Sequence, residues 1–429
     1  MVSVNNQLPP VNIDGVTPVE FTVVNEKTLD DLTSGESRLE ALGLEMDSLA
    51  HLCTVLETNP TTAMFTYALE KYGLSTVISA EDINQSAQQV WDRTKLNLRR
   101  YQSELFSYAK IIQSGADRAV ERLEMMHEMA GNLQGDPYKI SVVVKKNKKY
   151  AIDGTFVPND IRPLMDQSQN LFDFYDKVLL NYMRDIDKVI LKVDIDHEWT
   201  DDTIMKFERY DAKKWMNNYT EITEDDDRFR VSSNLVRSVI AQGDKAVYYS
   251  GPTDAKTETI KDWDFMVNTI RRLKLKYYTV PGMKPVNEEE NTVPVGNPNS
   301  IKQRIIYILG VAKRIKGRVG YDKKISSELR KLESDCERLR NKVRSMRTQV
   351  SKKVGEEETD PGRPVVSDIV KDLVLIMNSL TRLVTDYNNG LAAQLRLIGA
   401  LGYVADLELK AYEAPMKKPT KAIIDKTKV

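Results

Sequence analysis

The chain has 429 residues, of which 41% are hydrophobic and 29% charged, and its 62 basic and 63 acidic side chains leave a net charge of -1. This balance is typical of a protein with a packed core and excludes wholesale disorder, while the net charge indicates no partner. The two cysteines, Cys53 and Cys336, lack CxxC spacing and are expected to be small buried residues in a reducing compartment. Without a secretory signal or an uninterrupted apolar span, we expect a soluble protein made in a cytoplasm.

The first 36 residues differ from the rest of the chain. Prolines and glycines interrupt any helical period, and six acidic residues stand against one basic residue. Residues 1–36 are therefore predicted to be an acidic, poorly structured leader, with helix starting near Ser37.

Residues 37–135 show a helical pattern. Apolar residues from Leu39 to Leu56 recur at spacings of three and four, which predicts one amphipathic helix. Asn59-Pro60 should end it and start a second. A third helix is predicted from about Ser79 to Ile112 and a fourth from Gly115 to Met129.

Residues 136–298 contain both strand-like and helix-like patterns of apolar residues. Two strand-like runs, 140–144 and 150–154, flank lysine-rich residues 145–149 and predict a hairpin. Further strands are expected at 246–250 and 277–280, giving a small antiparallel sheet assembled from distant pieces. A long helix is predicted over 160–192, and the Pro- and Gly-rich residues 281–298 are predicted to be a linker.

Residues 299–412 predict a long helical hairpin, followed by a basic tail, 413–429. Its first helix carries apolar residues alternating at spacings of four and three, typical of a helix-pairing seam: Ile325, Leu329, Leu332, Cys336, Leu339, Val343, Met346 and Val350. The second helix, about 365–412, should fold back antiparallel and could kink at Asn388-Asn389-Gly390. The predicted fold is mainly α: an elongated helical bundle with long antiparallel C-terminal helices and a small antiparallel β element.

Catalytic motifs are missing from the sequence. It contains neither a phosphate-binding GxxxxGK[ST] loop nor a GxSxG elbow, and His127-Glu128 lacks the second histidine of a zinc protease. His51 is expected to be structural. The acidic run from Asp194 to Asp202 lacks the glycine and glutamate of a calcium loop. We expect no enzyme, no metal and no cofactor.

Basic residues concentrate in one region. Residues 301–354 contain 17 Lys and Arg against 5 Asp and Glu. Six of them cluster around Gly317 and Gly320, where the helix should weaken, and they are candidates for non-specific contact with double-stranded DNA: Lys313, Arg314, Lys316, Arg318, Lys323 and Lys324. The alternative is a basic helix that faces the protein's own acidic regions.

The order of these pieces resembles the phiKZ-like phage internal head proteins over about 37–412. The resemblance rests on Leu39-Glu40-Ala41-Leu42, the helix–break–helix at 56–63, Val90-Trp91-Asp92, the stretches 152–154 and 157–160, and the two long C-terminal helices.

The resemblance implies a structural protein of the virion interior, made in the bacterial host's cytoplasm. It would belong to the prohead core, packed in the capsid with the genome, and could be ejected with it. Its implied partners are capsid and core proteins and a prohead protease that removes the leader after a small-x-Glu sequence. Ser34-Gly35-Glu36 fits, which places the expected cut between Glu36 and Ser37.

Two other functions remain open from the sequence. One is a cytoplasmic helical scaffold or adaptor that pairs its seam with a partner helix. The other is an enzyme whose site forms only in three dimensions, which a pocket with converging titratable groups would indicate.

Overall fold

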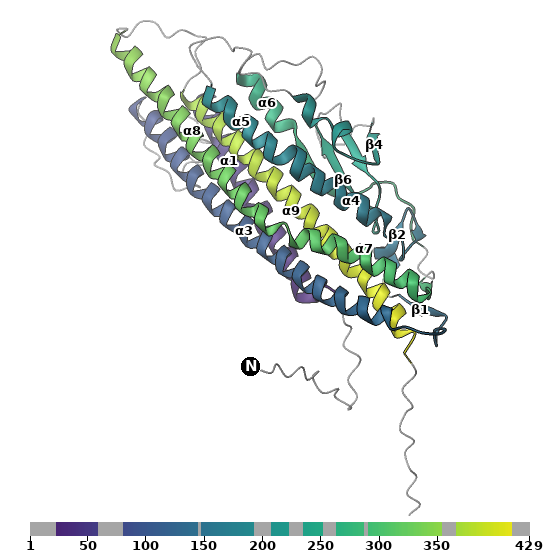
Figure 1. Ribbon diagram of the computed structural model, residues 1–429. Coiled ribbons are helices and arrows are strands. Elements are labelled where there is room, and N and C mark those ends of the chain that lie inside the picture. The colour runs from purple at the N-terminus through teal and green to yellow at the C-terminus, as the bar shows by residue number, and fades with distance from the viewer. Residues whose placement is uncertain are drawn as a thin grey trace, which may run out of the picture.

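The computed structural model describes residues 23–58, 80–144, 147–192, 207–222, 235–251, 263–286, 291–353 and 366–413. Long helices run side by side along an elongated body, and a small sheet lies on one flank (Figure 1). The predicted class, mainly α with small antiparallel sheets, is confirmed. The α-helices are α1 (Glu26–Thr58), α3 (Ala80–Gly131), α4 (Arg162–Asp173), α5 (Leu180–Lys192), α6 (Trp263–Arg272), α7 (Pro298–Lys316), α8 (Val319–Lys353) and α9 (Val366–Lys410).

Helix α9 forms the centre of the bundle. Its side chains are buried in every direction, as expected of a helix that is apolar all round. Helices α1, α3, α4, α7 and α8 and one edge of the sheet cover it. It runs antiparallel to α8, as predicted (Figure 1).

The strands of the described residues form three antiparallel sheets. β4 (Tyr219–Ile222), β5 (Leu235–Ser238), β6 (Lys245–Ser250) and β7 (Lys274–Thr279) lie in that order in one sheet, which confirms the predicted strands at 246–250 and 277–280. β7 lies against α9. The other two pairs are β1 (Ser141–Val143) with β8 (Thr292–Pro294), and β2 (Ala151–Ile152) with β3 (Thr155–Phe156).

The predicted hairpin of 140–144 with 150–154 is wrong. β1 pairs with β8, which lies within the predicted linker, and Asn147–Tyr150 is a short 3-10 helix. Asp153 and Gly154 both have positive φ, 47° and 76°, and form the two-residue turn between β2 and β3. Asp-Gly is a typical pair for this turn. The sequence signal for a hairpin was therefore present, but it belongs to β2 and β3 and not to the predicted strands.

The predicted division into two helices before Gly115 is also wrong, and the possible kink or break at Asn388-Asn389-Gly390 is not a break. α3 is continuous through Gly115, and α9 is continuous through Gly390. A Cβ at Gly115 would lie 2.7 Å from Leu395 Cδ2, and one at Gly390 would lie 2.7 Å from Leu171 Cδ2. These glycines therefore allow close helix approach. The predicted helix at 160–192 is confirmed, with a π-helical turn at Phe174–Leu179 between α4 and α5.

The leader boundary at residue 36 falls inside a helix. α1 begins at Glu26, because the Asn25 side chain caps it by accepting the Thr28 N–H at 2.9 Å. Val23, Val24 and Leu32 are buried in the main core, which also takes residues from 37–135, 136–298 and 299–412. The prediction that helix starts near Ser37 is therefore wrong. The second predicted helix and most of the tail, 414–429, lie outside the described residues.

Deleting residues 1–36 should destabilise the protein strongly. Three fully buried aliphatic side chains would be lost, at about 1.5–3 kcal/mol each, against a typical total stability of about 5–15 kcal/mol. The matched control begins at Thr22 and keeps all three. The chain beginning at Ser37 should unfold at a much lower temperature than the full chain, whereas the chain beginning at Thr22 should not. Equal unfolding midpoints for the two shortened chains would refute the packing of residues 23–36.

Candidate functional site

The predicted helix-pairing seam on α8 is buried inside the chain. Ile325, Leu329, Leu332 and Leu339 are each at most 5% exposed, and Cys336 is a buried free thiol. α8 packs on α5 and α9, and to a lesser extent on α3. This part of the seam therefore serves intramolecular packing. The side chains of Val343, Met346 and Val350 lie outside the described ones.

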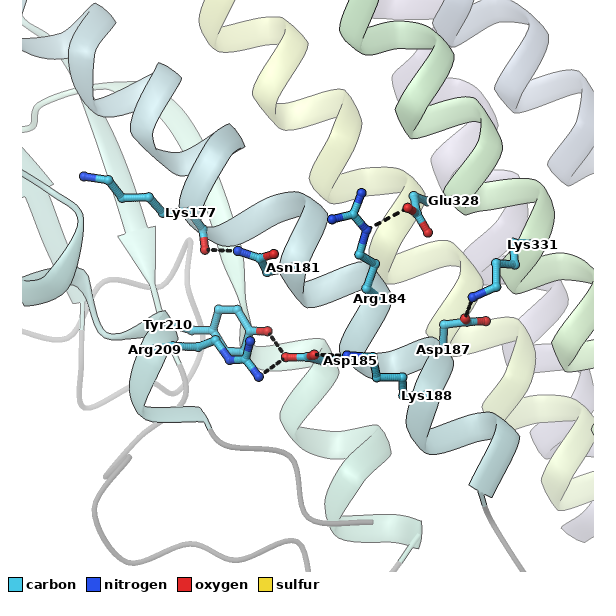
Figure 2. Close-up of polar contacts among 10 residues, drawn as sticks. All are labelled: Lys177, Asn181, Arg184, Asp185, Asp187, Lys188, Arg209, Tyr210, Glu328 and Lys331. Atoms are coloured by element: carbon cyan, nitrogen blue, oxygen red, sulfur yellow. Dashed lines mark hydrogen bonds and ion pairs between the residues drawn. The ribbon is translucent and has the colours of Figure 1, made fainter. Parts of the chain in front are cut away.

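Polar contacts border the seam on the side of α5 (Figure 2). Arg184 Nε donates to Glu328 Oε1 at 2.8 Å, and Lys331 donates to Asp187. Asp187 is buried, so its charge requires the lysine partner. These two pairs fix the register of α8 on α5.

Asp185 joins α5 to the short helix at Phe207–Tyr210. Its carboxylate accepts the Tyr210 hydroxyl at 2.5 Å and lies 2.7 Å from Arg209 Nη2 and 3.8 Å from Lys188 Nζ (Figure 2). Burial, and then Asp185, raise the pKa of Tyr210, so its hydroxyl stays a donor. Because all these partners are donors, the arrangement positions chain segments and provides no nucleophile–base pair.

Asp335 on α8 faces Asp187 across the same interface. Burial raises the pKa of Asp335 to about 6, together with a hydrogen bond to Asp187 and the negative charge of Asp187. Arg338, whose Nη2 lies 3.2 Å away, opposes this shift. Burial also raises the pKa of the nearby Cys336 thiol, which keeps it protonated. The raised pKa of Asp335 makes this interface sensitive to mildly acidic pH.

A second set of charges is buried around α9. Arg122 reaches Asp406 at 3.0 Å, and Arg304 pairs with Glu408; these acids are 1% and 0% exposed. Lys276 of β7 lies 2.6 Å from Asp386, whose pKa burial raises to about 6. The three elements α3, α7 and β7 thus each supply a cation to the central helix α9.

Four of the six proposed DNA contacts have identified partners within the chain, and a fifth, Lys324, also takes part in an interaction. Lys313 pairs with Glu124 at 2.7 Å and Lys316 with Asp117 at 3.1 Å, both on α3. Arg314 donates to Gln169, and Arg318 pairs with Asp176 while both guanidinium groups lie over Phe172. Lys323 is exposed, and Lys324 takes part in an interaction. The geometry favours the alternative, a basic helix facing the protein's own acidic side chains.

The expected cleavage position is part of the bundle. Glu36 accepts two hydrogen bonds from Arg396, at 2.8 and 3.0 Å, and one from Tyr108 at 3.1 Å, and the Ser37 hydroxyl donates to the Thr33 carbonyl. Position favours Glu36 over the other small-x-Glu sequences only if its segment is extended and exposed. That argument fails, since α1 is helical there.

Sequence reasoning missed the polar contacts although a signal was present. Glu328, Lys331 and Asp335 flank the apolar seam positions of α8, where pairing helices place their charged partners. No group of three or more His, Cys, Asp or Glu that could hold a metal occurs within the described ranges. The side chain of His51 and the acidic run 194–202 are outside those ranges. Among the helices described, none is long and apolar enough to cross a membrane.

Replacing Asp335 by Asn should raise stability near neutral pH. The folded-state pKa lies above the usual 3.8, so the folded protein binds the proton more tightly and loses stability as pH rises from about 4 to about 6. The amide of the Asp335→Asn variant would mimic the protonated carboxyl group, with a gain on the order of 1 kcal/mol at pH 7 that vanishes near pH 4. Asp386 leaves a residual dependence in the same direction.

Chemical unfolding across this pH range measures the effect, and Asp30→Asn, at an exposed carboxylate of α1, controls for the loss of one charge. An Asp335→Asn variant less stable than the parent at pH 7 would contradict the assignment.

No curated protein and no solved structure matches this chain. The family model of the phiKZ-like phage internal head proteins matches residues 47–407, from within α1 to near the end of α9. This match spans the bundle and the sheet described above. The chain therefore belongs to the phiKZ-like phage internal head proteins.

Proposed function

We propose that this internal head protein is a non-enzymatic packing element of the capsid interior, lying beside the genome as part of the prohead core. The observation that carries the proposal is that the most regular apolar stripe of the chain, on α8, is used in its own core. The described part of α8 thus builds a rigid body rather than a reactive centre. The virion interior agrees with the family match.

Contact with double-stranded DNA should be weak and sensitive to salt. Lys313 and Lys316 already have acidic partners, so a phosphate would have to displace Glu124 and Asp117 from these two lysines. The net charge of -1 provides no overall attraction. We propose that the protein fills space among capsid and core proteins, after synthesis in the bacterial cytoplasm. Processing by a prohead protease and ejection with the genome belong to the same proposal.

Purified phage particles should contain the protein inside an intact shell. Added protease should leave it uncut in intact particles and digest it after the shells are opened, while an exposed tail or capsid protein serves as the accessible control. Digestion in intact particles, or recovery only in the soluble extract of infected cells, would contradict the proposal.

One observation favours the adaptor function as a second candidate. The C-terminal turns of α8 extend past the start of α3 (Figure 1), and they carry the last seam positions, Val343, Met346 and Val350. A helix end that carries apolar residues at this spacing would suit a partner helix.

Two substitutions on α8 separate the candidates. Leu332→Asp should unfold the protein, because Leu332 is 1% exposed in the core. If α8 is an adaptor, Met346→Asp should abolish co-purification of a partner from soluble extract, with thermal unfolding as the check that the variant is folded. Unchanged recovery of partners and unchanged incorporation into heads with Met346→Asp would remove the adaptor function.

A further inference from the structure

A groove between α3 and α8 is left open by the packing of the bundle. Its volume is about 680 Å³, within the usual range of about 300–1,000 Å³ for ligand sites. Its lining comes from one face of each helix: Arg99, Gln102, Ser103, Phe106, Ser107 and Lys110 of α3, and Arg330, Glu333, Ser334 and Glu337 of α8. Three of these side chains are serines, which are too short to fill the space between the helices.

The groove combines an apolar side chain with hydrogen-bond donors. Phe106 is half-buried in its lining, between Ser103 and Ser107. Gln102 is 6% exposed, and its side-chain nitrogen has no hydrogen-bond partner. Leaving such a donor unpaired costs about 1–3 kcal/mol, so a ligand oxygen beside it would be stabilised.

Positive charge in the groove is incompletely neutralised. Glu333 is taken by Arg99 at 3.1 Å and Glu337 by Lys95 at 3.0 Å. Lys110 and Arg330 are exposed, and neither forms an ion pair among the residues that the structure describes. Two cations are therefore available at the rim, beside three hydroxyl groups.

We propose that this groove binds an acidic peptide segment of another protein, with its carboxylates on Lys110 and Arg330 and one apolar side chain on Phe106. Glu333 and Glu337 line the same groove and would repel the evenly spaced phosphates of a nucleic acid, whereas a peptide can place neutral residues beside them. The assignment goes beyond the proposed function, because it names a binding site and the chemistry of its partner.

The test uses the full chain and a short, fluorescently labelled peptide, Glu-Glu-Leu-Glu-Glu, with capped ends. The double variant Lys110→Ala/Arg330→Ala should weaken binding at least about tenfold, which is the effect of one lost charged contact. Lys139→Ala/Lys323→Ala removes two exposed lysines outside the groove and should leave the affinity unchanged. Ser103→Leu/Ser107→Leu should also weaken binding by filling the groove.

Each outcome decides the proposal. A peptide with Lys in place of Glu should not bind, and thermal unfolding confirms that the variants are folded. Equal losses of affinity in Lys110→Ala/Arg330→Ala and Lys139→Ala/Lys323→Ala would show general charge attraction and overturn the site. Tighter binding of a duplex DNA oligonucleotide, lost in Lys110→Ala/Arg330→Ala, would overturn the peptide as ligand. No binding of the acidic peptide to the parent chain would also overturn it.

Discussion

The burial of α9 on all sides is the constraint on which the rest of the structure depends. A 45-residue helix with this many buried side chains can be stable only if other elements cover its whole circumference. Its acids, the buried Asp406 and Glu408 and the partly buried Asp386, restrict how these elements pack on it. Each partner element must bring its cation to one position, because an unpaired buried charge costs about 3–5 kcal/mol. Apolar burial drives the assembly, and the ion pairs select its register.

Two irregularities in the covering helices meet at one arginine. The helix is interrupted between α7 and α8 at Gly317, and the π-helical turn separates α4 from α5. Arg318 connects them, since it pairs with Asp176 and lies over Phe172 and Tyr175. Before the break, α7 packs along α3; after it, α8 packs mainly on α5 and α9. This change of partner leaves α3 and α8 apart and gives the groove between them its width.

How far the sequence could predict the structure depended on the range of the interaction. Apolar periodicity found the long helices and the α8 stripe, because helix burial repeats every three or four residues. It could not show that Gly115 and Gly390 are sites of close helix approach, since that depends on Leu395 and Leu171, far away in sequence. Strand pairing failed for the same reason, because the partner of β1 is β8, far along the chain. The N-terminal boundary failed because proline and glycine content outweighed the Asn25 cap.

The proposed DNA contact was inferred from the local density of basic residues, and the ion pairs of the folded chain bear on that inference. A count of 17 basic residues in one region indicates a nucleic-acid surface only if those charges face solvent without partners. In the folded chain, α3 places Asp117 and Glu124 opposite Lys316 and Lys313, so sequence-distant acids pair with two of the six basic side chains of the cluster. Lys110 lies outside that region and Arg330 lies outside the cluster of six, yet both are exposed at a concave surface. For a protein that works by packing among others, uncompensated charge in a groove is therefore a better guide to binding than the local density of lysine and arginine.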